Sequence, residues 1–257
     1  MYDVLARYYD LIHDQLTEDL DFVLALAAEC GGPILELGCG TGRLLLPLVH
    51  AGHIVTGVDN EQAMLDRARR RLDEEVDEVQ QRVTLVQADS RSLSLPDEDD
   101  RFALVLFSYN TLLHFQPEGI RQTLRRVKRY LRKDGRLFLD VANPYVIEGI
   151  LYEDHSVLEN TFYNPTTEET IIQLSQSRLD FSEQCLHTTW YFETKKKSQQ
   201  PSNHASVEVE YWYQFPHQLE LLLQQSGFRL EQMMGDYDRS DFSEESERLL
   251  IIARPAA

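Results

Sequence analysis

Three closely spaced glycines follow a short apolar run, and they are the residues best placed to do chemistry. The run Ile34-Leu35-Glu36-Leu37 is typical of a strand and leads into Gly38-Cys39-Gly40-Thr41-Gly42. Glycines let the backbone turn tightly and let a ligand lie against it. The helix expected from Arg43 to His50 would present free N–H groups, which suit a negative group such as a carboxylate. The turn therefore predicts a ligand site between a strand and a helix.

The spacing of the glycines separates two classes of ligand. A dinucleotide site has the pattern G-x-G-x-x-G, but here Arg43 occupies the third glycine position and Gly42 stands one place earlier. This difference argues against a bound pyrophosphate, and so against a nicotinamide-dependent oxidoreductase, which is the alternative enzyme class. A tight turn without a ligand is the other alternative.

Acidic residues follow the next two expected strands. Asp59 ends the strand Ile54 to Val58, where a carboxylate could accept both ribose hydroxyls of an adenosine group. It could instead be a helix N-cap, although Asn60 could fill that role and leave Asp59 free. Asp89 follows the strand Val83 to Gln87 and could bind the adenine amino group, or it could be a plain turn carboxylate. Met64 could pack on the adenine or belong to the core.

Taken together, Glu36 to Gly42, Gly57-Val58-Asp59 and Ala88-Asp89 resemble the motifs of the class I (Rossmann-like) S-adenosylmethionine-dependent methyltransferases that act on small molecules. The resemblance implies S-adenosylmethionine as methyl donor, S-adenosylhomocysteine as product, and a seven-stranded sheet. The residues Ala6 to Asp10 resemble the N-terminal helix that covers the cofactor in such enzymes. The implied cofactor contacts are Tyr9, Glu36, Gly38, Cys39, Gly40, Arg43, Asp59, Asn60, Met64, Ala88, Asp89, Ser90 and Phe107.

The segment after the fourth expected strand, Ser108 to Phe115, should face the methyl group and its acceptor, because ligands lie beyond the carboxyl ends of such strands. His114 is the candidate base if the acceptor arrives protonated, and Tyr109 could orient the acceptor or contact the sulfonium. Either side chain could instead only pack. The segment lacks the Asn/Asp-Pro-Pro-aromatic motif that many methyltransferases of nucleic-acid bases carry here, which counts against a nucleic-acid base as the substrate. We expect no metal, because the sequence has no clear acidic cluster for magnesium.

The elements that must position these residues alternate between strand and helix from 33 to 142, which predicts an α/β fold with a doubly wound, mostly parallel sheet. Residues 2 to 30 have helical spacing and would form a cap, so domain 1–30 precedes a core of 31–145 and 214–257. From about 157 to 213 the period is two, which predicts an antiparallel insertion, 146–213, after the fifth strand and over the acceptor site. A closing hairpin spans 229–234 and 248–253.

Composition narrows the partners. The 257-residue chain carries a net charge of −18, so a phosphate backbone or an anionic membrane would be repelled. The basic helix face from Arg121 to Lys133 is best explained as a solvated surface. Three scattered cysteines and the lack of a long apolar stretch favour a cytoplasmic protein. We expect a monomer or a homodimer, although the sequence does not fix the oligomeric state. We therefore expect methyl transfer to an N or O atom of a small molecule, the alternative being a non-catalytic S-adenosylmethionine-binding protein.

Overall fold

A seven-stranded sheet forms the centre of the chain in a computed structural model, which describes residues 2–14, 16–96, 99–149, 156–164, 167–196 and 203–256. Its strand order is β10-β11-β5-β4-β1-β2-β3, and all neighbours are parallel except that β11 is antiparallel to both β5 and β10. This order confirms the predicted doubly wound α/β class. The strands are β1 (Ile34–Leu37), β2 (Val55–Asp59), β3 (Val83–Gln87), β4 (Phe102–Phe107), β5 (Leu131–Ala142), β10 (Phe228–Met234) and β11 (Arg248–Pro255).

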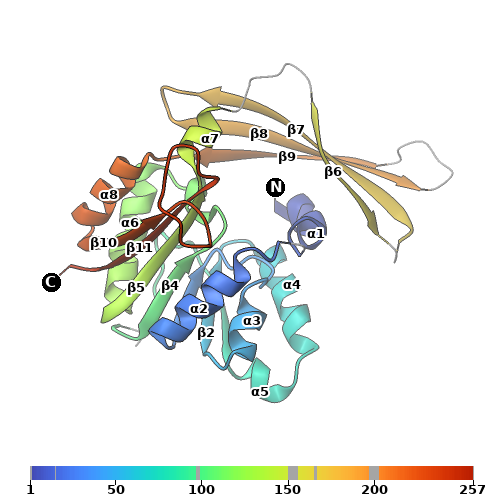
Figure 1. The fold of residues 1–257 in the computed structure, drawn as a ribbon. Helices are drawn as coiled ribbons and strands as arrows, with labels where there is room; N and C mark the ends of the chain where they lie inside the picture. The colour runs from blue at the N-terminus through green and yellow to red at the C-terminus, as the bar shows by residue number, and fades with distance from the viewer. Residues whose placement is uncertain are drawn as a thin grey trace.

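Helices cover both faces of this sheet (Figure 1). One face packs against α6 (Pro117–Tyr130) and α8 (Pro216–Gln225), and the other against α2 (Leu20–Cys30) and α3 (Leu45–His50). Strand β4 is buried at every position, as expected for a strand covered on both faces. The remaining helices are α1 (Tyr2–His13), α4 (Gln62–Asp73), α5 (Asp77–Gln80), α7 (Pro144–Glu148) and the 3₁₀ helix η1 (Thr111–His114).

The N-terminal helical region differs from the prediction because it consists of two helices, α1 and α2, rather than continuous helix from 2 to 30. The break is explained by a distant residue. Arg43 donates to the carbonyl of Leu16 at 2.9 Å and to the buried carboxylate of Asp19 at 2.7 and 2.5 Å. These bonds hold the linking segment against the core, so the two helices take separate positions.

Helix α6 also ends earlier than predicted, at Tyr130, whereas the predicted basic helix face extends to Lys133. Leu131 already pairs with Phe102 of β4, which begins β5 at once. The hydroxyl of Tyr130 donates to the carbonyl of Leu93 at 3.1 Å and accepts from the N–H of Leu95 at 2.9 Å. These tertiary contacts define the end of the helix, which the helical periodicity of the sequence could not show.

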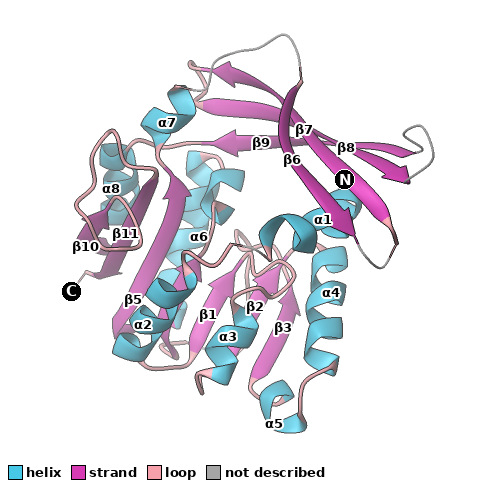
Figure 2. Cartoon of the chain, turned by 45° about the vertical axis from the view of Figure 1, so that its right-hand side comes forward, coloured by secondary structure: helices cyan, strands magenta, loops and turns pink. Residues whose placement is uncertain are grey.

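A second, antiparallel sheet comes from the segment after β5, with strand order β6-β7-β8-β9. It confirms the predicted antiparallel insertion. The sheet lies above the carboxyl ends of β1–β5, and α1 lies beneath it (Figure 2). Its strands are β6 (Val157–Asn164), β7 (Glu169–Asp180), β8 (Cys185–Lys196) and β9 (Asn203–Trp212).

Helix α1 packs directly on this second sheet. The ring of Tyr8 stacks on Phe192 with centroids 4.6 Å apart, within a cluster that includes Ile171, Val207 and Val209. Helix α1 and the insertion therefore cover the carboxyl edge of the main sheet. Within the described part of the chain, no helix has the length and apolar character to cross a bilayer.

Candidate active site

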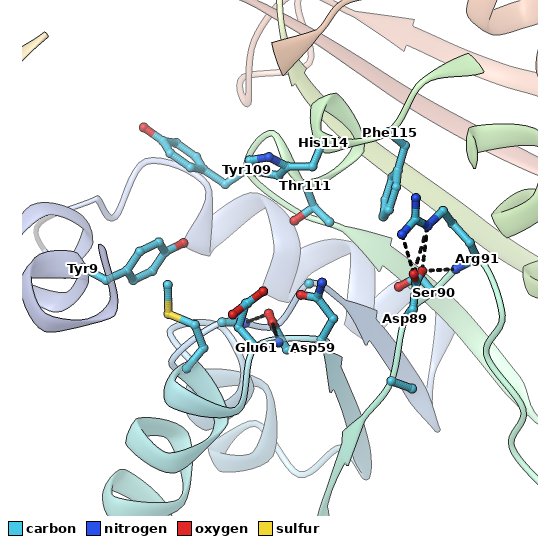
Figure 3. Close-up of a pocket in the computed structure, with 15 residues that line it drawn as sticks. Tyr9, Asp59, Glu61, Asp89, Ser90, Arg91, Tyr109, Thr111, His114 and Phe115 are labelled. Carbon is cyan, nitrogen blue, oxygen red and sulfur yellow. Dashed lines mark hydrogen bonds and ion pairs between the residues drawn. The ribbon is translucent and has the colours of Figure 1, made fainter. Parts of the chain in front are cut away.

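A cavity of about 240 Å³ opens at the carboxyl ends of β1 to β4, where the strand order reverses (Figure 3). This is the position at which α/β sheets bind ligands. It brings together most of the side chains singled out in the sequence, namely Tyr9, Gly38, Gly40, Asp59, Asn60, Met64, Ala88, Asp89, Ser90, Tyr109 and His114. The other lining residues are Thr111 and Phe115, which belong to the segment expected to face the acceptor, and Glu61 and Arg91, which the sequence analysis did not single out.

The glycine turn has a backbone that other residues would not tolerate. Gly38 and Gly40 have φ angles of 72° and 55°, in the left-handed region. A Cβ at Gly38 would lie 2.3 Å from Cγ2 of Thr111, so a side chain there would collide with the wall of the cavity. The N–H groups of Gly38 and Cys39 donate to the carbonyl of Val58 at 2.8 and 3.1 Å, which closes the turn onto β2.

Asp59 links this turn to the next helix. Its carboxylate accepts from the N–H of Gly40 at 2.8 Å and from the N–H of Glu61 at 2.9 Å. Burial raises the pKa of this carboxyl, while the two backbone donors oppose the rise. The suggestion that Asn60 caps the helix is wrong, since Glu61 occupies the N-cap position of α4 and no side chain caps it. Asn60 is instead exposed at the rim of the cavity.

Asp89 is paired within the cavity. Arg91 donates to it from its own backbone N–H at 2.8 Å and from its guanidinium at 2.5 to 3.0 Å. These hydrogen bonds lower the pKa of Asp89, so the carboxylate is ionised at neutral pH. Arg91 also offsets part of the negative charge that Asp59, Glu61 and Asp89 bring to the cavity. The only sequence signal for it was its place two residues after Asp89.

Tyr9 reaches the cavity from α1. A Cβ placed on Gly40 would lie 3.7 Å from the Tyr9 ring, so this ring lies directly over the glycine turn. The ring stacks on His13 with centroids 3.9 Å apart, and burial raises the pKa of the Tyr9 phenol. Its neighbour Tyr8 points into the insertion instead. The two adjacent tyrosines thus have different surroundings, one on the cavity and one in the core of the roof.

Four expected contacts lie behind the cavity wall: Glu36, Cys39, Arg43 and Phe107 are absent from its lining. Cys39 and Phe107 are buried in the core, and Arg43 is bound to Asp19. Glu36 is buried at the turn, and this burial raises its pKa to about 8. Among the described residues, Oε2 of Glu36 and the buried hydroxyls of Thr41 and Ser108 have no hydrogen-bond partner, so acceptor and donor groups remain available at this end.

These groups suit an adenosine that carries an amino-acid tail. Asp59 lies beside the glycine turn and offers a carboxylate, which can accept hydrogen bonds from ribose hydroxyls. Asp89 and Met64 lie in the same cavity. Glu36 lies next to the turn but behind the cavity wall, and its buried Oε2 has no hydrogen-bond partner among the described residues. The residues present therefore fit S-adenosylmethionine.

The opposite side of the cavity carries Tyr109, Thr111, His114 and Phe115, all from the loop after β4 and from η1 (Figure 3). His114 also lines a second cavity of about 690 Å³, whose other walls come from β7, β8 and β9. The surrounding protein lowers the pKa of His114 to about 4 by desolvation, although the ring remains open to solvent through the cavities. His114 is therefore neutral at pH 7. Its ring lies 5.4 Å from that of Tyr211.

Comparison with known proteins adds independent information. Residues 34–135 match a family model described as a methyltransferase domain. A protein of Geobacillus sp. (strain WCH70), named "Putative methyltransferase GWCH70_2453", is 26% identical over 98% of this chain and 99% of its own length.

Solved structures share the whole fold. The CcbJ methyltransferase from Streptomyces caelestis superposes with a TM-score of 0.77 at 22% identity, covering 93% of this chain and 95% of that one. The sugar N-methyltransferase KedS8 from Streptoalloteichus sp. ATCC 53650 gives a TM-score of 0.73 at 19% identity, covering 100% and 93%. The matches favour a methyltransferase over an oxidoreductase and over a non-catalytic binding protein. Residues 34–135 therefore form a methyltransferase domain, and the whole chain has the fold of S-adenosylmethionine-dependent methyltransferases.

Proposed function

We propose that this enzyme methylates a nitrogen or oxygen atom of a small molecule, with nitrogen favoured, and that the acceptor binds beside His114. The observation that carries the proposal is the position of His114, which lines both the cavity at the glycine turn and the cavity against the insertion. An acceptor that enters from the insertion side would meet the first cavity at this residue. The insertion, 146–213 in the predicted domain division, would then form the outer wall of the acceptor site.

The proposed donor contacts follow from the same geometry. Asp59 would accept the ribose hydroxyls, Asp89 the adenine amino group, and Glu36 the ammonium group of the amino-acid tail. Tyr9, Met64 and the glycine turn would enclose the donor, with Asn60, Ala88 and Ser90 at the adenosine end. Cys39, Arg43 and Phe107 would act from behind the wall, by packing or by holding neighbouring residues.

The reaction makes few covalent demands on the protein. S-adenosylmethionine supplies a methyl group already activated by its positive sulfur. The acceptor's lone pair forms the new bond to carbon while the carbon–sulfur bond breaks and leaves its electron pair on sulfur. Holding the acceptor in line with that bond can contribute about 7–11 kcal/mol. Tyr109 and His114 are the proposed groups that orient the acceptor.

The acid–base properties of the site favour nitrogen over oxygen. His114, with its pKa lowered to about 4, is a weak base, and burial raises the pKa of both Tyr9 and Tyr109, so their phenols stay protonated. A hydroxyl acceptor needs a base to become a good nucleophile, whereas a neutral amine already carries its lone pair. The sugar N-methyltransferase with the same fold agrees with this choice.

A labelling assay tests the proposal directly. The protein is given S-adenosylmethionine with a radiolabelled methyl group and a panel of amino sugars, aliphatic amines, phenols, alcohols and thiols. We expect label on the amines, and H114Q should slow transfer by up to about 100-fold, because the acceptor would be misplaced, while S-adenosylhomocysteine affinity stays nearly unchanged. His50 pairs with Glu75 on the exposed surface, so H50Q is the matched control. Faster labelling of phenols or alcohols would overturn the preference for nitrogen.

A further inference from the structure

Tyr109 is held in a backbone conformation that other parts of the chain must stabilise. Tyr109 and Asn110 have φ angles of 42° and 68°, so two consecutive non-glycine residues lie in the left-handed region. Such residues are strained unless their surroundings over-determine them. The loop follows the fully buried strand β4, and Tyr109 itself lines the cavity at the glycine turn. The strained pair therefore lies where the segment enters the site.

The stabilising contacts come from Asp140 at the end of β5. Its side chain is fully buried, and Oδ2 accepts from the backbone N–H of Tyr109 at 3.1 Å and from the hydroxyl of Tyr237 at 3.0 Å. Its backbone carbonyl accepts from the N–H of Asn110 at 2.9 Å. Both left-handed residues are thus fastened to a single residue of the neighbouring strand.

Arg248 of β11 completes the arrangement. Its Nε donates to Oδ1 of Asp140 at 3.0 Å, and its Nη2 donates to the same oxygen and, at 3.2 Å, to Oδ1 of Asn110. Its guanidinium carbon lies 5.1 Å from the centroid of the Tyr109 ring. One side chain therefore holds both the loop and the ring, and a planar guanidinium is needed for these tasks together.

A second guanidinium lies near the same ring. The Cζ of Arg43 is 5.6 Å from the Tyr109 centroid, and its charge is balanced by the buried Asp19 at 2.7 and 2.5 Å. Each arginine near the ring is thus paired with its own buried carboxylate. Cations over an aromatic face are attracted to it, and more strongly when desolvated. We name Arg43, Asp19, Arg248 and Asp140 the tyrosine clamp.

We propose that the tyrosine clamp positions the Tyr109 ring at the acceptor end of the cavity, with Arg248 and Asp140 as positioning residues that act through Tyr109. This inference rests on the proposed acceptor role of the segment from Tyr109 to His114. It also assigns Arg43 a role other than contact with the cofactor. Arg43 occupies the position of the third glycine in a dinucleotide motif, and in this protein it holds the Tyr109 ring in place. The clamp joins β11, at one side of the sheet, to the loop after β4.

Fluorine NMR of the full-length protein labelled with 3-fluorotyrosine tests the clamp without requiring an acceptor. The Tyr109 resonance is identified by its loss in Y109F. We expect R248K and R43K to shift or broaden it, because lysine keeps the charge but not the planar group. The control is R254K, on the same strand, where Arg254 pairs with Glu231 away from the cavity. R254K should leave the Tyr109 resonance in place.

Calorimetric titration with S-adenosylhomocysteine separates this proposal from the proposed function. We expect R248K to bind it within about twofold of the unaltered protein, since Arg248 does not itself line the cavity and the change keeps the positive charge. D140N is the more severe change, and R248K keeps the test valid if D140N does not fold. Three outcomes would overturn the proposal that the clamp positions Tyr109. They are an unchanged Tyr109 resonance in R248K, an equal change in R254K, and a tenfold loss of S-adenosylhomocysteine affinity in R248K. If the Tyr109 resonance shifts in R248K but the unaltered protein does not bind S-adenosylhomocysteine, the clamp is supported and the proposed methyl transfer is refuted.

Discussion

At the residue scale, Glu36 is a group whose charge at neutral pH depends on the fold. It lies on β1 with its side chain buried, and burial raises its pKa to about 8, although the nearby Arg43 opposes that rise. An exposed glutamate ionises near pH 4.5. Between these two values the folded chain holds a proton that the unfolded chain has released. Folding must therefore become less favourable as the pH rises through this interval.

This proton predicts a pH-dependent difference between the unaltered protein and E36Q. As the pH rises from about 5 to 8, the free energy of unfolding should fall relative to E36Q by up to about 1.4 kcal/mol per pH unit, because glutamine cannot ionise. Urea denaturation across this range measures the difference. E78Q is the control because Glu78 is exposed on α5. A difference between the unaltered protein and E36Q that stays flat would show that Glu36 ionises normally.

The cavity residues that could be predicted from the sequence are those whose positions follow from local chain geometry. Gly38, Gly40, Asp59 and Asp89 end strands or begin turns, so they had to reach the carboxyl edge of the sheet. Cys39 and Phe107 are sequence neighbours of such residues and point into the core instead. Their direction depends on packing from the other face. Glu61 and Arg91 were missed because they carry no motif of their own.

At the element scale, α1 is fastened to α4 by charge. Asp10 pairs with Arg67 at 2.7 Å and with Arg71 at 2.8 Å, and Arg71 also pairs with Asp14 at 2.7 Å. These pairs join residues about one helix turn apart on each helix. Tyr9, the residue before Asp10, covers the glycine turn, so the helix that these ion pairs hold against α4 also covers the cavity. We call these ion pairs the latch. Exit of a ligand from the cavity should therefore require these ion pairs to loosen.

The latch predicts a faster release of S-adenosylhomocysteine in R71E. The change replaces attraction to Asp10 and Asp14 by repulsion, and partly exposed pairs contribute up to about 1 kcal/mol each, so dissociation should accelerate by about three- to tenfold. Stopped-flow displacement measures the rate. The effect should shrink at high salt because these charges are partly exposed.

R69E provides the matched control for the latch. Arg69 lies on the same helix but pairs with Asp66 of α4 itself, at 3.0 Å. Its reversal changes the net charge as much as R71E does without touching α1. If R69E accelerated release as much as R71E, general electrostatics rather than the latch would govern dissociation.

At the scale of the whole molecule, α1 connects the cavity at the glycine turn to the insertion. One of its faces carries Tyr9 over the glycine turn, and Tyr8 stacks on Phe192 of β8 at 4.6 Å. The hydroxyl of Tyr8 also lies 3.3 Å from Oγ1 of Thr194. Ordering of α1 by a ligand in the cavity should therefore reach the second sheet.

Hydrogen exchange tests this connection. Saturation with S-adenosylhomocysteine should slow amide exchange in α1 and in β8 together, because a ligand stabilises the elements that pack around it. F192A removes the stacked ring and should keep the protection of α1 while reducing that of β8. L186A, in the same strand but outside the Tyr8 cluster, is the control. Protection of β8 that survives in F192A would show that the two sheets are linked by another route.

By itself, the sequence determined the order of strands and helices, the parallel core, the antiparallel insertion and the ligand edge, because hydrophobic periodicity and chain connectivity are local properties. It also placed the glycine turn, Asp59 and Asp89 at that edge. Only the tertiary structure decided which side chains face the cavity and which ones brace it. The pairs of Arg43 with Asp19, Arg71 with Asp14 and Arg248 with Asp140 join residues far apart in the chain. Such pairs form only after the sheet has brought their elements together, and no local pattern records them.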